Sequence, residues 1–261
     1  MRPYPSLIAA GLILVCVGPA LADDRIPTGT LRATYIATNP VQASRDPANG
    51  ELRGPSATIA REIARRLGAP VKITGVAGPA AVIESVKTGE ADIGFIAFDP
   101  QRAAEVDFSQ VYALAQNTYL VREDSPIRTV ADVDRAGIRV GVTGRDTADL
   151  VLTRSFTAAE LRRNTTGSIE TAIQWLADGT VQAYGTNRQR LTELAARHPG
   201  FRLLPDNFYG VPQSVVAAKG NTAMIDVVNG VIDEARRSGL IARSVEEVGL
   251  AGVDVAPPRK D

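Results

Sequence analysis

Apolar residues recur along this chain with two alternating periods, one typical of strands and one typical of helices. Between residues 56 and 68, Ile59, Ile63 and Leu67 recur at helical spacing, and Gly68 predicts the helix end. The first half therefore predicts a strand, a hairpin, a helix, a strand, a helix and a strand over residues 29–38, 42–54, 56–68, 70–76, 78–89 and 91–98. Strands that alternate with helices in this order indicate a βαβαβ unit.

The same order of elements returns in the second half of the chain. The stretch AVIESVKTGEADIGF is similar to TAIQWLADGTVQAYG, because each combines an amphipathic helix, a glycine and a short apolar strand. Strands are expected over residues 137–143, 158–164 and 210–220, a helix over 146–156, and a helix, a turn and a strand over 168–185. A last helix is expected over 222–239, with one apolar side: Ile225, Val228, Ile232 and Ala235. The repeated pattern predicts an architecture of two α/β lobes.

The N-terminus has the features of a secretory signal peptide. Arg2 supplies a positive charge, residues 7–17 form an apolar run, and the small-residue site Ala20-Leu21-Ala22 predicts cleavage after Ala22. An uncleaved membrane anchor is the alternative, but the run is shorter than the roughly 20 apolar residues that a span needs. Cys16 follows the bulky Val15, which argues against a lipid-attachment site. We therefore expect an exported periplasmic protein.

Composition limits the partners and the source of stability. The 29 basic and 29 acidic residues of the full chain become 28 and 29 once Arg2 is removed with the signal, a net charge of −1 that predicts no nucleic-acid or membrane partner. The one cysteine lies in the signal, so the mature chain is expected to fold without disulfides. A hydrophobic fraction of 44% suits a packed globular α/β protein.

Four segments, in order along the mature chain, carry a resemblance to a known family. They are GELRGPSATIAREIARRLG, ESVKTGEADIGF, DPQRAAEVDFSQVY and VADVDRAGIRVGV. The chain resembles family 3 of the periplasmic solute-binding proteins of ABC importers, the amino-acid-binding type with the type II periplasmic binding protein-like fold. The resemblance implies two α/β lobes joined by two crossover strands, with a ligand cleft between them that closes like a flytrap.

The resemblance also implies a domain organisation and a function. After the signal peptide (1–22), residues 23–112 are expected to begin lobe 1, residues 113–208 to form lobe 2, and residues 209–261 to return to lobe 1 with a C-terminal helix. The expected role is capture of a small polar or anionic solute that bears a carboxylate, by a monomer that delivers it to an ABC permease in the inner membrane. The alternatives are a periplasmic enzyme like the cyclohexadienyl or arogenate dehydratases of the wider family, and a solute sensor for a membrane receptor.

Arg102 is the main candidate in lobe 1. In the family, the arginine of the matching motif holds the ligand carboxylate, and a guanidinium suits this role because its planar fork of donors matches a carboxylate. The alternative is an exposed arginine paired with Asp99, Glu105 or Asp107.

Three further candidates lie near strand ends of lobe 1. Asn39 is either a ligand contact or a turn former before Pro40. Phe95 and Ala97 occupy positions where the amino-acid binders of the family carry small hydroxyl residues, so they are expected to form an apolar wall, although Phe95 could equally lie in the core.

In lobe 2, VTGRDTADL matches the strand-to-helix turn of the family. Thr143 and Thr147 are the expected contacts, whereas Asp146, which replaces the family's glycine before threonine, is expected to cap the helix. Arg145 faces either the cleft or solvent.

The strand that ends the second half departs furthest from the family pattern. Amino-acid binders of the family present an aspartate there for the ligand ammonium, but residues 185–188 are Gly, Thr, Asn and Arg. Thr186 and Asn187 are the candidate contacts. The missing acid predicts a preference for organic acids over zwitterionic amino acids, unless Asp146 or Asp149 supplies the charge from the neighbouring turn.

Other chemistries have little support in the sequence. His198 is the one histidine and Trp175 lies at helical spacing with core residues, so no His/Cys metal site is expected and no cofactor is implied. The chain has no G-x-S-x-G, P-loop or G-x-G-x-x-G motif. We therefore expect a binding protein and not an enzyme; a dehydratase would need a positioned acid such as Glu84, Asp99 or Asp146.

Overall fold

The computed structural model describes residue 26 and residues 28–165 and 168–258. The predicted signal peptide, residues 1–22, lies outside these residues. The strands are β1 (Leu31–Ile36), β2 (Ser44–Arg45), β3 (Leu52–Arg53), β4 (Val71–Val76), β5 (Ile93–Ala97), β6 (Val106–Arg122), β7 (Arg139–Thr143), β8 (Glu160–Asn164), β9 (Ala183–Asn187), β10 (Phe201–Leu203), β11 (Tyr209–Ala218) and β12 (Val253–Val255). The helices are α1 (Pro55–Arg66), α2 (Pro79–Lys87), α3 (Thr147–Ser155), α4 (Glu170–Ala177), α5 (Arg188–Arg197), α6 (Thr222–Arg237) and α7 (Leu240–Glu246), with short 3-10 turns η1 (Arg102–Ala104) and η2 (Val130–Asp132).

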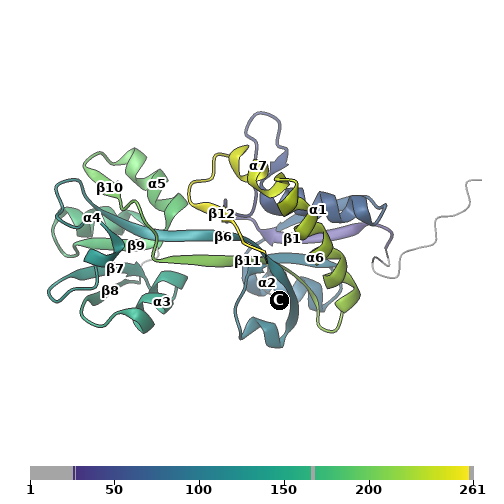
Figure 1. Ribbon diagram of the computed structural model, residues 1–261, viewed down its shortest axis with the longest axis horizontal. Helices are drawn as coiled ribbons and strands as arrows, with labels where there is room; N and C mark the ends of the chain where they lie inside the picture. The colour runs from purple at the N-terminus through teal and green to yellow at the C-terminus, as the bar shows by residue number, and fades with distance from the viewer. Residues whose placement is uncertain (1–25, 27, 166–167, 259–261) are drawn as a thin grey trace, which may run out of the picture.

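The chain forms two α/β lobes, as the resemblance implied (Figure 1). Lobe 1 contains β1–β5, α1, α2 and η1 together with α6, α7 and β12, and lobe 2 contains β7–β10, η2 and α3–α5. Strands β6 and β11 run antiparallel to each other and pass from one lobe to the other. They are the two crossover strands. Within the described part of the chain, no helix has the length and apolar character that a membrane span requires.

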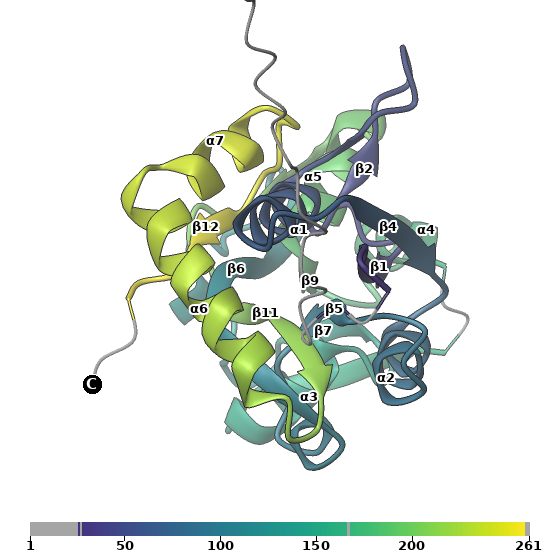
Figure 2. The same cartoon turned by 90° about the vertical axis from the view of Figure 1, so that its right-hand side faces the viewer.

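The sheet of lobe 1 has the strand order β4-β1-β5-β11-β6, in which β1 pairs in parallel with β4 and β5. Neighbouring strand residues face opposite sides, so Phe95 packs in the cluster with α1 and α6 while Ile96 packs in the cluster with α2. Figure 2, seen along the long axis, shows α1, α6 and α7 on one side of this sheet and α2 on the other. Each face of the sheet is therefore covered.

Lobe 2 repeats this plan with the strand order β6-β9-β7-β8, where β7 pairs in parallel with β8 and β9. Helix α3 covers one face, with Leu152 packed near Val140 and Val142, and α4 and α5 cover the other through Leu176 and Leu191. The repeated pattern in the sequence is thus the pattern of two separately covered sheets.

Local sequence signals set the helix ends. Pro55 occupies the first turn of α1 after Gly54. Proline suits this position because its fixed φ matches the helix and because an N–H in the first turn would have no acceptor within the helix. The predicted apolar residues Ile59 and Ile63 are fully buried. In α6, Asn221 caps the helix by accepting a hydrogen bond from the Met224 N–H, and the predicted apolar side is buried: Ile225, Val228, Ile232 and Ala235. Both helices are confirmed.

Candidate ligand-binding cleft

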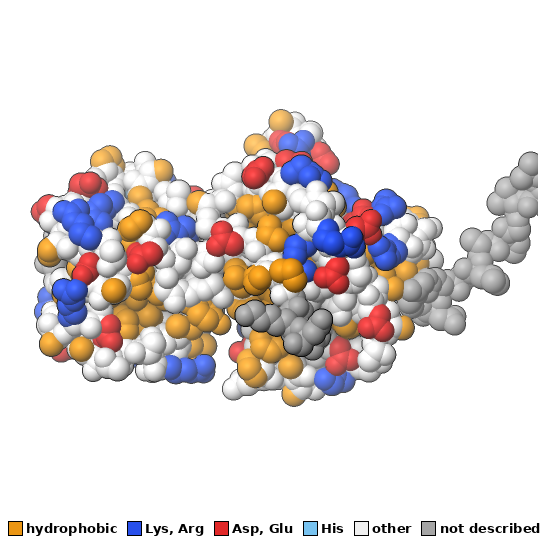
Figure 3. Space-filling model, viewed as in Figure 1, with side chains coloured by type: hydrophobic (Ala, Val, Ile, Leu, Met, Phe, Trp, Pro, Cys, Tyr) orange, Lys and Arg blue, Asp and Glu red, His pale blue; other side chains and the backbone are white. Residues whose placement is uncertain are grey.

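A gap separates the lobes on the side where α2 and α3 lie. Figure 3 shows this gap opening at the lower edge of the molecule, and Figure 1 places α2 and α3 on either side of it in the same view. Strand β4 of lobe 1 ends in the turn that precedes α2, and strand β7 of lobe 2 ends in the turn that precedes α3. Ligands of α/β sheets bind outside the carboxyl ends of parallel strands. The predicted contacts at the ends of β1, β5, β7 and β9 can therefore be compared with one shared cleft.

Arg102 begins the turn η1 that follows β5. Its side chain is half-buried, and Nη1 donates a 2.9 Å hydrogen bond to the Ala97 carbonyl, which ties the guanidinium to the end of β5. The alternative ion pairs with Glu105 and Asp107 are not made, since Glu105 pairs with Lys87 at 2.7 Å and Asp107 with Lys219 at 2.8 Å.

Asp99 does not neutralise this guanidinium either. Its Oδ1 accepts hydrogen bonds from the backbone N–H groups of Gln101 and Arg102, at 2.9 and 3.3 Å. Among the residues that the structure describes, Arg102 has no carboxylate partner within 4.0 Å. The turn holds an arginine in place and leaves its charge without a counter-ion.

The other lobe 1 candidates divide into surface and core. Asn39 is half-buried in the turn that follows β1, where its Oδ1 accepts from the Val41 N–H at 3.2 Å. Phe95 is fully buried and packs edge-to-face on Tyr112, with ring centroids 6.0 Å apart, so its side chain lies in the core. Ala97 is half-buried at the strand end, and the next residue, Phe98, is 42% exposed beside Phe108. The exposed apolar side chain at this strand end is therefore Phe98, which was not among the residues predicted from the sequence.

Thr143 and Thr147 flank the turn between β7 and α3. The Thr143 hydroxyl lies 3.2 Å from the Tyr184 hydroxyl, which also accepts from Asn164 at 3.3 Å. Thr147 is the first residue of α3 and is half-buried. Both threonines therefore lie at the carboxyl end of β7, where a ligand between the lobes would meet lobe 2.

Asp146 caps α3, as predicted, and also touches the end of β9. Its Oδ1 accepts from the Asp149 N–H at 2.9 Å, and its Oδ2 lies 3.3 Å from the Thr186 hydroxyl. Thr186 is buried and pairs in register with Thr118 of the crossover strand β6. Burial raises the pKa of the Asp146 carboxyl above its ordinary value, because partial removal from water disfavours the charged form more than these hydrogen bonds favour it.

The second acid of this turn is fully paired. The Asp149 carboxylate accepts from the Arg145 N–H and from Arg163 Nε, both at 2.9 Å, and from the Thr153 hydroxyl at 3.1 Å. Arg145 has a left-handed φ of 67°, a conformation that is uncommon for residues other than glycine. A cavity of about 520 Å³ adjoins this turn and is lined by Thr143, Gly144, Arg145, Asp149, Arg163, Asn164 and Thr165.

The last residue of β9 and the first residue of α5 make hydrogen bonds within lobe 2. Asn187 caps α5 by accepting from the Arg190 N–H at 3.3 Å. Arg188 donates to the carbonyls of Leu204 and Asp206, both at 2.9 Å, so its charge is held by the backbone of lobe 2. The extra cation that the sequence offered at this strand end is not free to meet a solute.

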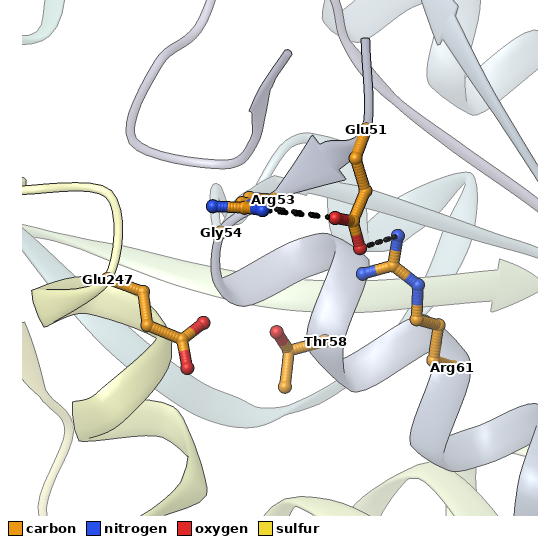
Figure 4. A pocket seen from close by; sticks show the side chains of 6 residues that line it. All are labelled: Glu51, Arg53, Gly54, Thr58, Arg61 and Glu247. Atoms are coloured by element: carbon orange, nitrogen blue, oxygen red, sulfur yellow. Dashed lines mark hydrogen bonds and ion pairs between the residues drawn. The ribbon is translucent and has the colours of Figure 1, made fainter. Parts of the chain in front are cut away.

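A second cavity, of about 440 Å³, lies beside the β2–β3 hairpin, α1 and α7 (Figure 4). Its lining is Glu51, Arg53, Gly54, Thr58, Arg61 and Glu247. Arg53 pairs with Glu51 at 3.2 Å and Arg61 lies 3.9 Å from the same carboxylate. These charges largely satisfy one another, and the cavity borders none of the parallel strand ends, so it is separate from the cleft.

His198 and Trp175 each contact residues of lobe 2. His198 ends α5 and its Nε2 lies 2.8 Å from Glu170. Trp175 is half-buried against Tyr184, with ring centroids 6.4 Å apart. Within residues 28–165 and 168–258, no group of three or more His, Cys, Asp or Glu side chains is arranged to hold a metal ion.

Comparison with known proteins gives consistent results. The family model described as bacterial extracellular solute-binding proteins, family 3, matches residues 32–249. The chain is 28% identical over 179 residues to a glutamine-binding protein of Geobacillus stearothermophilus, covering 67% of each chain. It is 23% identical over 199 residues to the ABC transporter glutamine-binding protein GlnH of Bacillus subtilis (strain 168), covering 75% of this chain and 72% of that one.

Solved structures show the same fold. An ancestral cationic amino-acid solute-binding protein superimposes with a TM-score of 0.66 and 23% identity, over 87% of this chain and 99% of that chain. Another structure of that ancestral protein, described as a precursor of cyclohexadienyl dehydratase, superimposes with a TM-score of 0.61 and 23% identity, over 84% of this chain and 94% of that chain.

Proposed function

This chain belongs to family 3 of the bacterial extracellular solute-binding proteins, and on that basis we propose that it captures a small polar or anionic solute, an amino acid or an organic acid, and delivers it to an ABC importer. The relatives support the proposal, since both are named glutamine-binding proteins and one is named as part of an ABC transporter. The family is extracellular, which agrees with export, and we assign the chain to the periplasm as a monomer that meets a permease in the inner membrane.

Arg102 is the observation that carries this proposal. Its guanidinium is fixed to Ala97 by one hydrogen bond and has no carboxylate partner among the described residues. A solute carboxylate would accept from the remaining N–H groups and supply the missing counter-ion. Thr143, Thr147 and Asn39 are the proposed neutral contacts around it, whereas the buried Phe95 and Thr186 support the walls.

Closure is the proposed mechanism of capture. Strands β6 and β11 join lobes whose apolar clusters are separate, so the lobes can rotate about these strands without repacking. A solute held by Arg102 from one lobe and by the β7–α3 turn from the other favours the closed arrangement, because only that arrangement makes both sets of contacts.

A thermal-shift screen of metabolites followed by calorimetry tests the proposal. For the best carboxylate ligand, Arg102→Ala is expected to weaken binding by about 10- to 150-fold, the equivalent of the roughly 1.5–3 kcal/mol of hydrogen bonds to a charged group. Arg237→Ala, at an exposed arginine at the end of α6, is the matched control and should leave binding unchanged. Equal binding by wild type and Arg102→Ala would contradict the carboxylate role.

An enzyme on the same scaffold is the competing function. Of the acids that a dehydratase would need, Glu84 is exposed on α2 and Asp99 is engaged with its own turn, while Asp146 is a half-buried carboxyl with a raised pKa. Incubation with prephenate or arogenate separates the two functions. We expect no turnover, and product formation that Asp146→Asn abolishes would establish the enzyme instead.

A further inference from the structure

Strands β1 and β5 separate where they approach the cleft. They pair in parallel as far as Thr34 and Gly94, and both strands continue beyond these residues. Two proposed solute contacts of lobe 1 depend on this region, since Asn39 lies in the turn after β1 and Arg102 in the turn after β5. A group that joins the two strand ends therefore sets the position of Asn39 relative to Arg102.

The side chain of Gln42 joins these strand ends. It is fully buried, its Oε1 accepts from the Ile36 N–H of β1 at 2.9 Å, and its Nε2 donates to the Phe95 carbonyl of β5 at 3.1 Å. Because the amide accepts from one strand and donates to the other, it takes the place of a peptide group in the sheet. Two backbone groups that the separating strands would leave without a partner are thereby satisfied.

The same amide reaches the crossover strand β11. Its Nε2 lies 3.4 Å from Oε1 of Gln213, which is buried and pairs in register with Ala97 of β5. The Ala97 carbonyl in turn accepts from Nη1 of Arg102 at 2.9 Å. A continuous set of contacts thus runs from Gln42 through the end of β5 to the Arg102 guanidinium.

Gln42 also holds the turn that contains Asn39. The Gln42 N–H donates to the Asn39 carbonyl at 3.1 Å, and the Asn39 N–H donates to the Ile36 carbonyl at 2.9 Å. The side-chain bond from the Ile36 N–H to Gln42 closes the same turn from the other side. Burying an amide is unfavourable unless its polar atoms are paired, and here each of them is paired with a segment that leads to a proposed solute contact.

We propose that Gln42 is a positioning residue for solute recognition: it joins the ends of β1 and β5 to β11 and so fixes the spacing and orientation of Asn39 and Arg102, an assignment that rests on the proposed function. Hydrogen bonds to a solute weaken steeply when their geometry is poor. Loss of the buried amide should therefore lower the affinity for the solute as well as the stability of lobe 1.

Calorimetry on Gln42→Met tests this role, because methionine keeps the length of the side chain and removes both polar atoms. The probe is the tightest-binding member of the standard amino acids and the corresponding acids without the α-amino group, beginning with L-glutamine. We expect the affinity to fall by about 2- to 30-fold. In an Arg102→Ala background the same substitution should have a smaller effect, because part of its action passes through Arg102.

Thr34→Val is the matched control on the same strand. It removes a buried 3.0 Å hydrogen bond between the hydroxyls of Thr34 and Ser85, so it should lower the melting temperature and leave the affinity unchanged. If Gln42→Met does not fold, Gln42→Asn takes its place with the same expectation, because asparagine keeps an amide that is too short to reach both strands.

The possible outcomes separate the positioning role from the proposed function. Wild-type affinity in the folded Gln42 variant, an equal loss of affinity in Thr34→Val, or an undiminished effect in the Arg102→Ala background would overturn the positioning role, whereas weaker binding by Arg102→Ala alone would still support the carboxylate site. If no probe binds wild type, both the positioning role and the proposed carboxylate solute are overturned.

Discussion

A contact between the lobes on the side away from the cleft should hold the cleft open. The Ala251 N–H, in the segment between α7 and β12, donates a 2.6 Å hydrogen bond to Gln189 Oε1 in the first turn of α5. The same segment is tied to the crossover strand β6 through the Gly252 carbonyl, which accepts from the Gln116 N–H at 2.7 Å. Figure 1 shows it bridging the lobes along the upper edge, opposite the gap in Figure 3.

Closure of the cleft should break this contact. Strands β6 and β11 lie between the upper bridge and the lower gap, so a rotation about them that narrows the gap moves α5 away from the bridge. Replacing Gln189 by alanine removes the acceptor in the open arrangement only. A net hydrogen-bond contribution of about 0.5–1.5 kcal/mol predicts a 2- to 13-fold shift toward the closed arrangement, and the same gain in apparent affinity if most molecules are open without solute.

Spin-label distances measure this shift without any solute. The chain from Asp23 onwards has no cysteine, so cysteines placed at Glu84 of α2 and Arg154 of α3, both exposed, label the two sides of the cleft specifically. Pulsed electron resonance measures the distance between the two labels. In Gln189→Ala, a larger fraction of molecules should have the shorter distance than in the parent protein. Gln174→Ala, at an exposed glutamine of α4, should match the parent. A longer distance, or an unchanged distribution, in Gln189→Ala would refute the reasoning.

Three further predictions concern stability and processing. Ser56→Ala should cost about 1–3 kcal/mol in urea unfolding, because the buried Tyr112 hydroxyl loses its 3.1 Å partner; adding Tyr112→Phe should recover part of that loss, and an additive cost would contradict the pairing. The pKa of Asp134 lies well below its ordinary value, because its carboxylate accepts from the backbone N–H groups of Ala159, Thr157 and Ala158. The stability that this carboxylate contributes to the fold is therefore present above about pH 4 and is lost as the pH falls below that value. Asp134→Asn should therefore melt lower than wild type at pH 7 and lose less stability on acidification, and parallel melting curves for the two proteins would argue against this. The exported protein should begin at Asp23 without lipid, and an intact mass that includes an acylated Cys16 would exclude this.

The fold could largely be predicted because its signals are local. The spacing of Ile59 and Ile63 in α1, the apolar side of α6 and the strand–helix alternation of both halves each depend on neighbouring residues, and the structure contains all of them. Helix α7 and the short strands β10 and β12 were not predicted. The 17-residue strand β6 was expected only in part, as the first crossover, because residues 117–121 near its end are buried on both faces within lobe 2 and so lack the alternation of a one-sided strand.

The candidate site was less predictable because it depends on contacts between distant segments. Arg102 could be found from its motif, since the turn η1 follows β5 directly. The meeting of Asp146 with Thr186 could not, because it requires β9 to pair with β7, and no pattern within either segment specifies that neighbour. The preference for organic acids, argued from the absence of an acid after β9, stays a prediction, as does the alternative that Asp146 supplies the charge.

The separation of the two apolar cores bears on how the proposed closure would depend on the solute. The largest apolar cluster of lobe 1 reaches Ala115 on β6, and the cluster of lobe 2 that contains α3 begins at Tyr119. Rotation about the residues between them changes few buried contacts, so closure depends mainly on what the solute contributes at Arg102 and at the β7–α3 turn. We therefore expect a solute that contacts only one lobe to leave the cleft open, because the closed arrangement is favoured only by contacts with both lobes.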